Sequence, residues 1–406
     1  MRIDPAKHPW LNEPQTRAVM QALGHARFVG GVVRNALLGV PVTDIDIAVP
    51  VPPERTVALL QAANIKAIPT GFDHGTITAV LDNRVFEVTS LRRDIATDGR
   101  HAIVSYTSEW DEDAARRDFT INALYAAADG EIFDYTGGIQ DLVAGRVRFV
   151  GDPQARIRED YLRILRLFRF HAWYGKGEMD ADALHAAAQG KAGLQQLSGE
   201  RIAKEILRLL ECVNPAPVLR VMAASGILNE VLPQASQLPR LERLIHSDAE
   251  NLFAPDAILR LAALLPDDPV GAFAVAERLK LSGADRARLE DLAGAPHDMP
   301  AYASVREVRK RLYRIGAAAF QARIRLNWAA AAPGSAIAWR MLLSVADSWE
   351  KPKFPLTGRD VMTAGVPEGP QVGKILAAVE DWWMDGDFAA DETAVTEKLK
   401  AILSAQ

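Results

Sequence analysis

The stretch FVGGVVRNALLGVPVTDIDIAV, residues 28–49, decides the fold of the first part of the chain. It predicts a short apolar strand, a pair of glycines, a helix and a second strand. Gly30 and Gly31 let a phosphate approach the backbone, and the start of the next helix favours an anion. Because side chains alternate along a strand, Asp44 and Asp46 share one face, roughly 7 Å apart. Two such carboxylates are costly unless a cation joins them, and hard oxygen ligands suit Mg²⁺. The stretch therefore predicts a site for a metal-bound triphosphate.

Each part of this pattern has a simpler explanation. A glycine pair before a helix is more often only a turn. An Asp-x-Asp pair is usually a solvated strand face, or a metal site of the kind found in sugar-nucleotide transferases. The combination at this spacing is much more specific than either part.

Length and composition describe an ordinary globular protein. A chain of 406 residues predicts two or three domains, and 49% hydrophobic with 24% charged residues is typical of soluble proteins. The sequence has no run of 18 apolar residues, so it predicts no membrane span. The single cysteine, Cys212, excludes an intrachain disulfide, and residues 1–9 lack the apolar core of a signal peptide. These features predict a cytoplasmic protein without a membrane partner.

The net charge of −5 does not indicate a nucleic-acid binder, but charge is unevenly distributed. Residues 305–325 hold seven Arg or Lys against one Glu. A local basic stripe can guide a phosphate backbone even on an acidic protein. The alternative is a set of solvated helix faces.

The periodicity of the chain changes near residue 150, where strand signals end and helical periodicity takes over. The sequence therefore predicts an α+β fold, with a mixed α/β head at 1–145, a helical neck at 146–215, and a helical body and tail at 216–406. Strands are expected at 26–30, 44–50, 65–69, 75–81 and 85–90, and head helices at 14–23, 31–38, 53–63 and 113–127.

A third acidic candidate, Glu87, alternates with apolar neighbours on the strand 85–90. If this strand neighbours the one that carries Asp44 and Asp46, three carboxylates converge. Such a cluster would hold two metal ions for in-line phosphoryl displacement. Otherwise Glu87 faces solvent on an edge strand.

The segment RRDFTINAL, residues 116–124, is a second chemical signal. Arg116 suits bidentate phosphate contact. Asp118 and Asn122, four residues apart, would share a helix face and could bind ribose hydroxyls. The alternative is a helix cap beside a solvated basic pair.

The segment REDYLRILRLFRF, residues 158–170, carries the third signal. Its apolar residues follow helical spacing and mark a buried face. Asp160 could accept from the exocyclic amine of cytosine or adenine while Arg163 donates to the same base edge, so the pair could read C and A. The alternative is simple ion pairing along a helix, worth a few tenths of a kcal/mol.

These segments, in this order and spacing, resemble the class II CCA-adding enzymes (tRNA nucleotidyltransferases) of the DNA polymerase β superfamily, whose relatives include bacterial poly(A) polymerases. The resemblance covers roughly residues 25–210, and the remainder matches loosely, chiefly at 356–383. It implies template-independent addition of C, C and A to tRNA 3′ ends from CTP and ATP, with tRNA but no DNA as partner. A poly(A) polymerase and an A-only or CC-only enzyme stay open, as do a non-catalytic RNA-binding module and a sugar-nucleotide transferase.

The resemblance also implies a role for each matching residue. Mg²⁺ would be held by Asp44 and Asp46, with Glu87 near the primer 3′-OH as the third catalytic acid. The remaining residues would bind the nucleotide. Its phosphates would contact Gly30, Gly31, Arg34 and Arg116, and its sugar would contact Asp118 and Asn122. Its base would pair with Asp160 and Arg163, supported by Arg166 and Arg169.

Three further expectations concern single positions. The resemblance implies that Asp134, in a turn-rich loop expected to be mobile, would help the switch from CTP to ATP. Asn35 stands where the family usually has Asp. The Asn35 amide keeps hydrogen-bonding capacity but lacks the charge of a carboxylate. His297-Asp298 is the only His-Asp pair, and nothing around it resembles the ligand spacing of a phosphohydrolase, so no such domain is expected.

Overall fold

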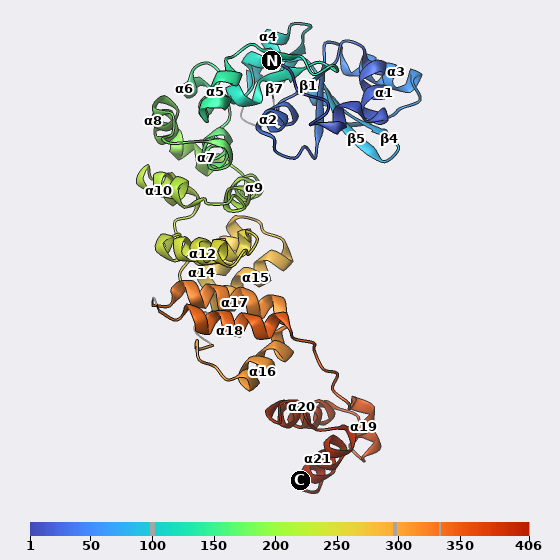
Figure 1. Cartoon of the computed structure of the whole chain (residues 1–406), viewed down its shortest axis with the longest axis vertical. Helices are drawn as coiled ribbons and strands as arrows, with labels where there is room; N and C mark the ends of the chain where they lie inside the picture. The colour runs from blue at the N-terminus through green and yellow to red at the C-terminus, as the bar shows by residue number, and fades with distance from the viewer. Residues whose placement is uncertain (98–101, 295–298, 333, 406) are drawn as a thin grey trace. The chain divides into compact units, whose positions relative to one another are not determined.

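The structure, a computed structural model, describes residues 1–97, 102–294, 299–332 and 334–405. The pair His297-Asp298 lies outside these residues. The chain divides into two compact units, Met1–Pro233 and Gln234–Gln406 (Figure 1). Among the described helices none combines the length and the apolar character needed to cross a membrane.

The first unit is built on a seven-stranded sheet with the strand order β3-β4-β5-β2-β1-β8-β9. The central strands β2 and β5 run parallel, whereas the other neighbouring strands are antiparallel. A separate two-stranded sheet pairs β6 with β7. The strands are β1 Arg27–Val29, β2 Ile45–Val49, β3 Lys66–Gly71, β4 Thr76–Leu81, β5 Arg84–Ser90, β6 Arg92–Thr97, β7 Ala102–Tyr106, β8 Leu124–Ala126 and β9 Ile132–Asp134.

All five expected strands are confirmed within two residues at either end, as are three helices of the head. These are α1 Pro14–Leu23, α2 Gly31–Leu38 and α3 Pro53–Ala62. The α+β fold class, with a sheet-containing head and a helical remainder, is confirmed as well.

The helix predicted over 113–127 is wrong. The structure has a short helix α4, Trp110–Ala115, then a 3-10 turn at Thr120–Asn122, then strand β8. Leu124, Tyr125 and Ala126 are fully buried between β1 and β9, so sheet pairing overrides their local preference for a helix.

The core of the head explains why acidic side chains reach one face of the sheet. Ile45 and Ile47 on β2, and Phe86 and Val88 on β5, are fully buried. Alternation along the two strands then sends the intervening side chains, Asp46 and Glu87, to the opposite face.

Helices make up the rest of the first unit: α5 Gly138–Ala144, α6 Pro153–Glu159, α7 Leu162–Tyr174, α8 Ala181–Gly190, α9 Gly199–Leu210, α10 Ala216–Ala224 and α11 Ile227–Val231. Helix α7 carries the apolar face expected of the third segment, since Ile164, Leu165 and Phe168 are buried. It packs against α9, which supplies the acidic partner Glu205 for Arg166 and Arg169 of α7.

The second unit is entirely helical in its described residues, with α12 Leu238–Glu250, α13 Ala257–Leu264, α14 Pro269–Arg278, α15 Gly283–Gly294, α16 Val305–Ile315, α17 Ala317–Ala330, α18 Ala336–Asp347, α19 Gly358–Thr363, α20 Pro370–Asp385 and α21 Glu392–Ser404. One apolar cluster joins α16, α17 and α18, and another joins α19, α20 and α21.

The basic stripe at 305–325 is largely paired within this unit. Lys310 and Arg314 on α16 form ion pairs with Asp385 and Asp381 of α20, and Arg309 pairs with the nearby Asp387. On α17 the remaining cations also have carboxylate partners: Arg323 pairs with Asp291 and Arg325 with Asp248. The stripe is therefore in large part a set of helix-to-helix ion pairs.

Candidate active site

A cleft of about 410 Å³ opens on the face of the sheet that carries the acidic side chains. It collects residues from β1, β2, β4 and β5 together with the segment that follows α4. Its lining is Val29, Asp46, His74, Thr76, Glu87, Thr89, Arg92, Arg116 and Arg117.

Asp46 and Glu87 are direct neighbours, because the parallel register of β2 and β5 pairs these two positions. The pKa of Asp46 is raised to about 6, first by burial and then by the charge of Glu87, while Arg117 opposes the shift and Asp44 adds to it. Asp44 lies just before β2, exposed, and accepts a hydrogen bond of 3.1 Å from the Thr43 hydroxyl. The strand adjacency expected for Glu87 is thus present.

This donor set fits a divalent cation. Burial and the charge of Glu87 raise the pKa of Asp46, so a positive ion beside it would stabilise its carboxylate, and hard oxygen ligands suit Mg²⁺. Within the described residues no group of three or more His, Cys, Asp or Glu side chains is arranged to hold a metal ion. Mg²⁺ usually keeps waters and takes oxygens from substrate phosphates, so two protein carboxylates are compatible with binding.

The glycine turn lies beside this cleft. Gly30 ends β1 with φ of +72°, a conformation that side chains rarely adopt. A Cβ added there would lie 3.7 Å from Nη1 of Arg117, so the bare backbone leaves that guanidinium accessible. Helix α2 begins at Gly31, and its first N–H groups lie at the same turn.

Three arginines line the cleft. Two of them, Arg116 and Arg117, are held by a residue that the sequence reasoning missed. The Asp113 carboxylate on α4 pairs with Arg116 at 2.5 Å and with Arg117 at 3.0 Å. Arg117 itself was also missed. The sequence signal that could have revealed the cluster is an acid three and four residues before adjacent arginines, the spacing of helical ion pairs.

Arg34 is buried in a polar network beneath the glycine turn. Its guanidinium donates to the Asn122 amide oxygen, to Oδ1 of Asn35 and to the Tyr174 hydroxyl at 2.9 Å. Burial lowers the pKa of Arg34, although Tyr174 and Asp118 oppose the shift. Contact between Arg34 and a phosphate stays a prediction, since the structure shows these protein partners only.

Replacing Asn35 by Asp should be tolerated and mildly stabilising. Oδ1 of Asn35 accepts from Nε and Nη2 of Arg34 at 3.2 and 2.9 Å, and a carboxylate would make these bonds charge-assisted. We expect Asn35→Asp to raise the free energy of unfolding by about 1 kcal/mol, seen as a higher thermal midpoint. Asn35→Leu, which removes the acceptor, should lower the midpoint; equal midpoints for the two variants would contradict the pairing.

Asp118 and Asn122 meet as expected, although no helix joins them. Nδ2 of Asn122 donates to Oδ1 of Asp118 at 3.1 Å, and Arg166 donates to Oδ2 of Asp118 at 2.8 and 2.5 Å. Burial would raise the pKa of Asp118, but Arg166 and Asn122 outweigh it and the pKa is lowered. This carboxylate is therefore ionised and fixed in place.

The structure does not pair Asp160 with Arg163. Oδ2 of Asp160 accepts from Arg201 on α9 at 2.7 Å, and its Oδ1 caps α7 through the Leu162 N–H. Arg163 pairs instead with Glu159 and donates to the Arg156 carbonyl. Arg169 pairs with Glu205 of α9. A role for any of these side chains in reading a base stays a prediction.

Asp134 closes β9 and caps α5. Its carboxylate accepts four backbone N–H bonds, at 2.9 to 3.1 Å, from Thr136, Gly137, Gly138 and Ile139. In this structure the turn is thus tied together by one side chain, and its predicted part in a nucleotide switch is a matter for experiment.

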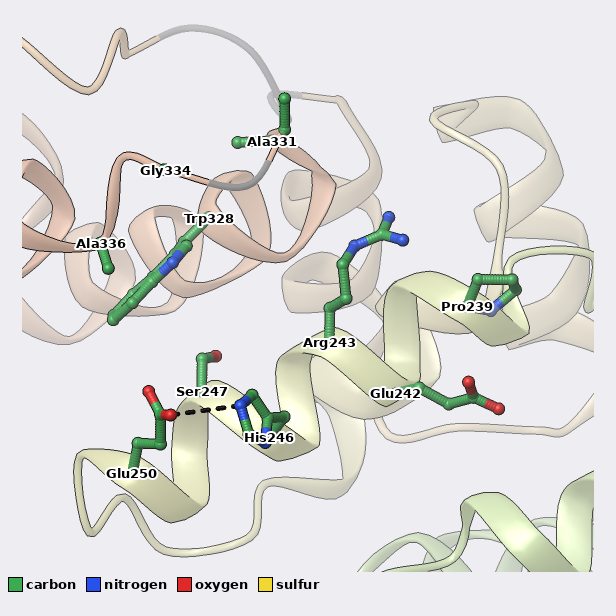
Figure 2. A pocket seen from close by; sticks show the side chains of 11 residues that line it. Pro239, Glu242, Arg243, His246, Ser247, Glu250, Trp328, Ala331, Gly334 and Ala336 are labelled. Carbon is green, nitrogen blue, oxygen red and sulfur yellow. Dashed lines mark ion pairs between the residues drawn. The ribbon is translucent and has the colours of Figure 1, made fainter.

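The second unit contains a separate pocket of about 540 Å³, between α12 and the α17–α18 pair (Figure 2). Trp328 and Arg243 project into it, while His246 lies 3.1 Å from Glu250 on the same helix. Acidic and basic side chains are mixed along its α12 wall, namely Glu242, Arg243, His246 and Glu250. The cleft of the first unit is therefore the candidate active site.

Family models assign the class to which this architecture belongs. Residues 26–148 match the poly A polymerase head domain, and residues 178–238 match a probable RNA and SrmB-binding site of polymerase A. The first match spans the whole cleft, including the glycine turn, β2, β5 and the arginines. The fold and the cleft thus define a nucleotidyltransferase.

The curated relatives narrow the class. The mouse mitochondrial CCA tRNA nucleotidyltransferase 1 is 33% identical, with 92% of this chain and 86% of the relative covered. The CCA-adding enzyme of Streptococcus sanguinis is 31% identical, with 94% of each chain covered. The chain belongs to the family of CCA-adding tRNA nucleotidyltransferases, whose chemistry generally uses a divalent metal.

Solved structures share the fold over nearly the entire chain. The Bacillus stearothermophilus CCA-adding enzyme in complex with CTP aligns with a TM-score of 0.76 at 24% identity, covering 99% of this chain and 98% of that one. The Thermotoga maritima CCA-adding enzyme complexed with tRNA aligns with a TM-score of 0.68 at 20% identity, covering 99% of each. At these identities the likeness speaks for the fold alone.

Proposed function

We propose that this chain adds C, C and A to tRNA 3′ ends, using CTP and ATP and no nucleic-acid template. The observation that carries the proposal is the β2–β5 register, which sets Asp46 beside Glu87 in a cleft that also contains Arg116 and Arg117. Family membership supports the choice of reaction.

The proposed cofactor is Mg²⁺, held by Asp44 and Asp46. Bound there, it would supply activation of the primer 3′-OH and stabilisation of the pyrophosphate leaving group. Glu87 would orient that hydroxyl from the neighbouring strand. Arg116, Arg117 and the Gly30–Gly31 backbone would neutralise and position the triphosphate.

The rest of the nucleotide would contact the elements behind the cleft. Asp118 and Asn122 would accept from and donate to the ribose hydroxyls. Asp160 and Arg163 would read the base, with Arg166 and Arg169 fixing the helix α7 through their pairs with Asp118 and Glu205. Base reading then requires Asp160 to leave Arg201 and Arg163 to leave Glu159, so the protein's own ion pairs compete with the incoming base.

The helical neck at 146–215 and the body and tail at 216–406 would hold the RNA. Because the matched RNA-binding model covers residues 178–238, we assign the first RNA contacts to that segment. The proposed compartment is the cytoplasm, although the mouse and human relatives are mitochondrial by name.

One extension assay tests the proposal. The purified chain is incubated with Mg²⁺, all four nucleoside triphosphates and tRNA lacking its 3′ CCA, and the products are sequenced. Ends that read CCA support it. A long A tail would establish a poly(A) polymerase. An end that stops at CC, or that gains only A, would establish a partial enzyme. RNA that binds without being extended would indicate a binding module.

Arg163→Ala should relax base choice more than it lowers RNA affinity. A lost contact to a base edge is worth about 1–3 kcal/mol of discrimination, so misincorporation of G and U should rise by about tenfold or more. Sequencing of the products and filter binding of tRNA measure the two effects. Arg208→Ala, which breaks an exposed pair with Glu211, is the matched control; fidelity unchanged in Arg163→Ala would remove the base-reading role.

A further inference from the structure

A single buried carboxylate organises the basic wall of the cleft. The Asp113 side chain, on α4, is 1% exposed and does not itself line the cleft. Its Oδ1 accepts from Nε and Nη2 of Arg116 at 2.9 and 2.5 Å, and its Oδ2 accepts from Nε and Nη2 of Arg117 at 3.2 and 3.0 Å. Each arginine is thus held by its own oxygen of the Asp113 carboxylate, in both cases through Nε and Nη2.

Two further donors fix the carboxylate itself. The Tyr125 hydroxyl donates to Oδ2 at 2.6 Å, and the Arg92 backbone N–H donates to Oδ1 at 3.2 Å. Tyr125 belongs to strand β8 and Arg92 begins β6, so Asp113 is anchored to two sheets. Burial would raise the pKa of Asp113, but Arg117 and Arg116 outweigh it and lower the pKa to about 2. The group is therefore an anion throughout the neutral range.

This arrangement leaves one nitrogen of each guanidinium unused. Nε of Arg116 also donates to the Arg92 carbonyl, and Nε of Arg117 to the Tyr125 hydroxyl. Among the described residues Nη1 of Arg116 and Nη1 of Arg117 have no hydrogen-bond partner, and Nη1 of Arg117 lies at the bare backbone of Gly30. Both arginines line the cleft, with 15% and 18% of their side chains exposed.

Asp113 also gives Arg117 an anionic partner away from the acidic wall. Arg117 and Asp46 line the same cleft, and Arg117 pairs with Asp113 at 3.0 Å. A guanidinium pairs with the carboxylate that is nearest and best oriented. Without an anion at position 113, Arg117 would turn toward Asp46 and occupy the carboxylate assigned to the metal.

We propose that Asp113 is a positioning residue for the nucleotide triphosphate: it holds Arg116 and Arg117 so that their free nitrogens face the phosphates, and it keeps Arg117 from Asp46. The inference deepens the proposed function and rests on it. It assigns the arginines' orientation, rather than only their charge, as the source of triphosphate affinity.

The structure offers a closely matched control. Asp141 is likewise buried, with 3% of its side chain exposed, and pairs with two arginines, Arg146 and Arg148, at 3.1 and 3.0 Å. Its partners do not line the cleft. Asp141→Asn therefore disturbs a buried carboxylate that pairs with two half-exposed arginines of the same unit, without touching the proposed triphosphate contacts.

The test is calorimetric binding of CTP and CMP in EDTA, so that no metal enters the measurement. For Asp113→Asn we expect the Kd for CTP to rise by about tenfold or more, as removal of a charge-assisted contact predicts, whereas the Kd for CMP and the Kd for tRNA change less than about threefold. Asp141→Asn should leave the Kd for CTP unchanged. Thermal midpoints of all variants report folding.

Each outcome decides one question. An unchanged Kd for CTP in folded Asp113→Asn overturns the inference. So does a rise in the CTP Kd of Asp141→Asn that equals the rise in Asp113→Asn. An Asp113→Asn variant that loses CTP and CMP affinity equally also overturns it. If Asp113→Asn does not fold, Asp113→Glu keeps the charge but displaces the carboxylate, and an unchanged CTP Kd there would overturn it equally. Failure of the unaltered chain to bind CTP would refute the proposed function instead.

Discussion

Asp46→Asn is expected to abolish nucleotide addition while tRNA still binds. The amide keeps the shape of the side chain but cannot supply an anionic oxygen to a cation, and charge stabilisation by metal ions contributes several kcal/mol to such reactions. We expect the extension rate to fall by about a thousandfold or more, measured as single-nucleotide addition to tRNA lacking its 3′ end. Since Asp46 lies in the sheet-based head, the RNA affinity of the chain should be retained.

Asp82→Asn is the matched control for this variant. Asp82 lies at the exposed turn between β4 and β5, on the same sheet but outside the cleft, and its φ of 46° suits Asn as well as Asp. Its extension rate should equal that of the unaltered chain. Substantial activity in Asp46→Asn, or activity lost only through lost RNA binding, would contradict the role assigned to Asp46.

The second large effect is on stability, and it lies in the helical second unit. Asp248 on α12 and Arg325 on α17 form a bidentate pair at 2.9 and 2.8 Å, with 2% and 10% of the side chains exposed. Asp248→Ala leaves a buried guanidinium without its anion, which costs about 3–5 kcal/mol. Urea unfolding followed by tryptophan fluorescence should show an earlier transition for this unit, whose described core contains Trp339.

Two variants show whether the cost comes from the unpaired charge. Asp381→Ala breaks the exposed pair with Arg314 and should change the stability by no more than about 1 kcal/mol. The double variant Asp248→Leu with Arg325→Met removes both charges, and because buried pairs gain little over apolar contacts it should recover most of the loss. A double variant as unstable as Asp248→Ala would contradict this explanation.

Local patterns were enough to predict the central strands of the head and its first helices. The alternation around Ile45 and Ile47, and again around Phe86 and Val88, encodes both the strands and the face on which Asp46 and Glu87 project. The glycines of the first turn are equally local, because Gly30 needs a positive φ. The adjacency of the two strands was only conditional in the sequence and is shown by their register.

What the sequence could not reveal depends on distant partners. The segment after α4 resembles a helix by composition, yet Tyr125 is drawn into the sheet by strands from both sides. Asp160 and Arg163 share a helix turn, but Arg201, which lies far along the chain, takes the carboxylate. The spacing of Asp113 to the two arginines is local, but its other donors are distant in the sequence: the Arg92 N–H of β6 and the Tyr125 hydroxyl of β8.

The pairing of the 305–325 cations with acids of their own unit has a consequence for experiments at varied ionic strength. RNA affinity falls with salt in proportion to the phosphates that a protein neutralises, because counterions are released on binding. A cation already neutralised by Asp381 or Asp385 displaces no such ions. The logarithmic slope contributed by this stretch should therefore fall well short of seven, even if the whole stretch faces the RNA.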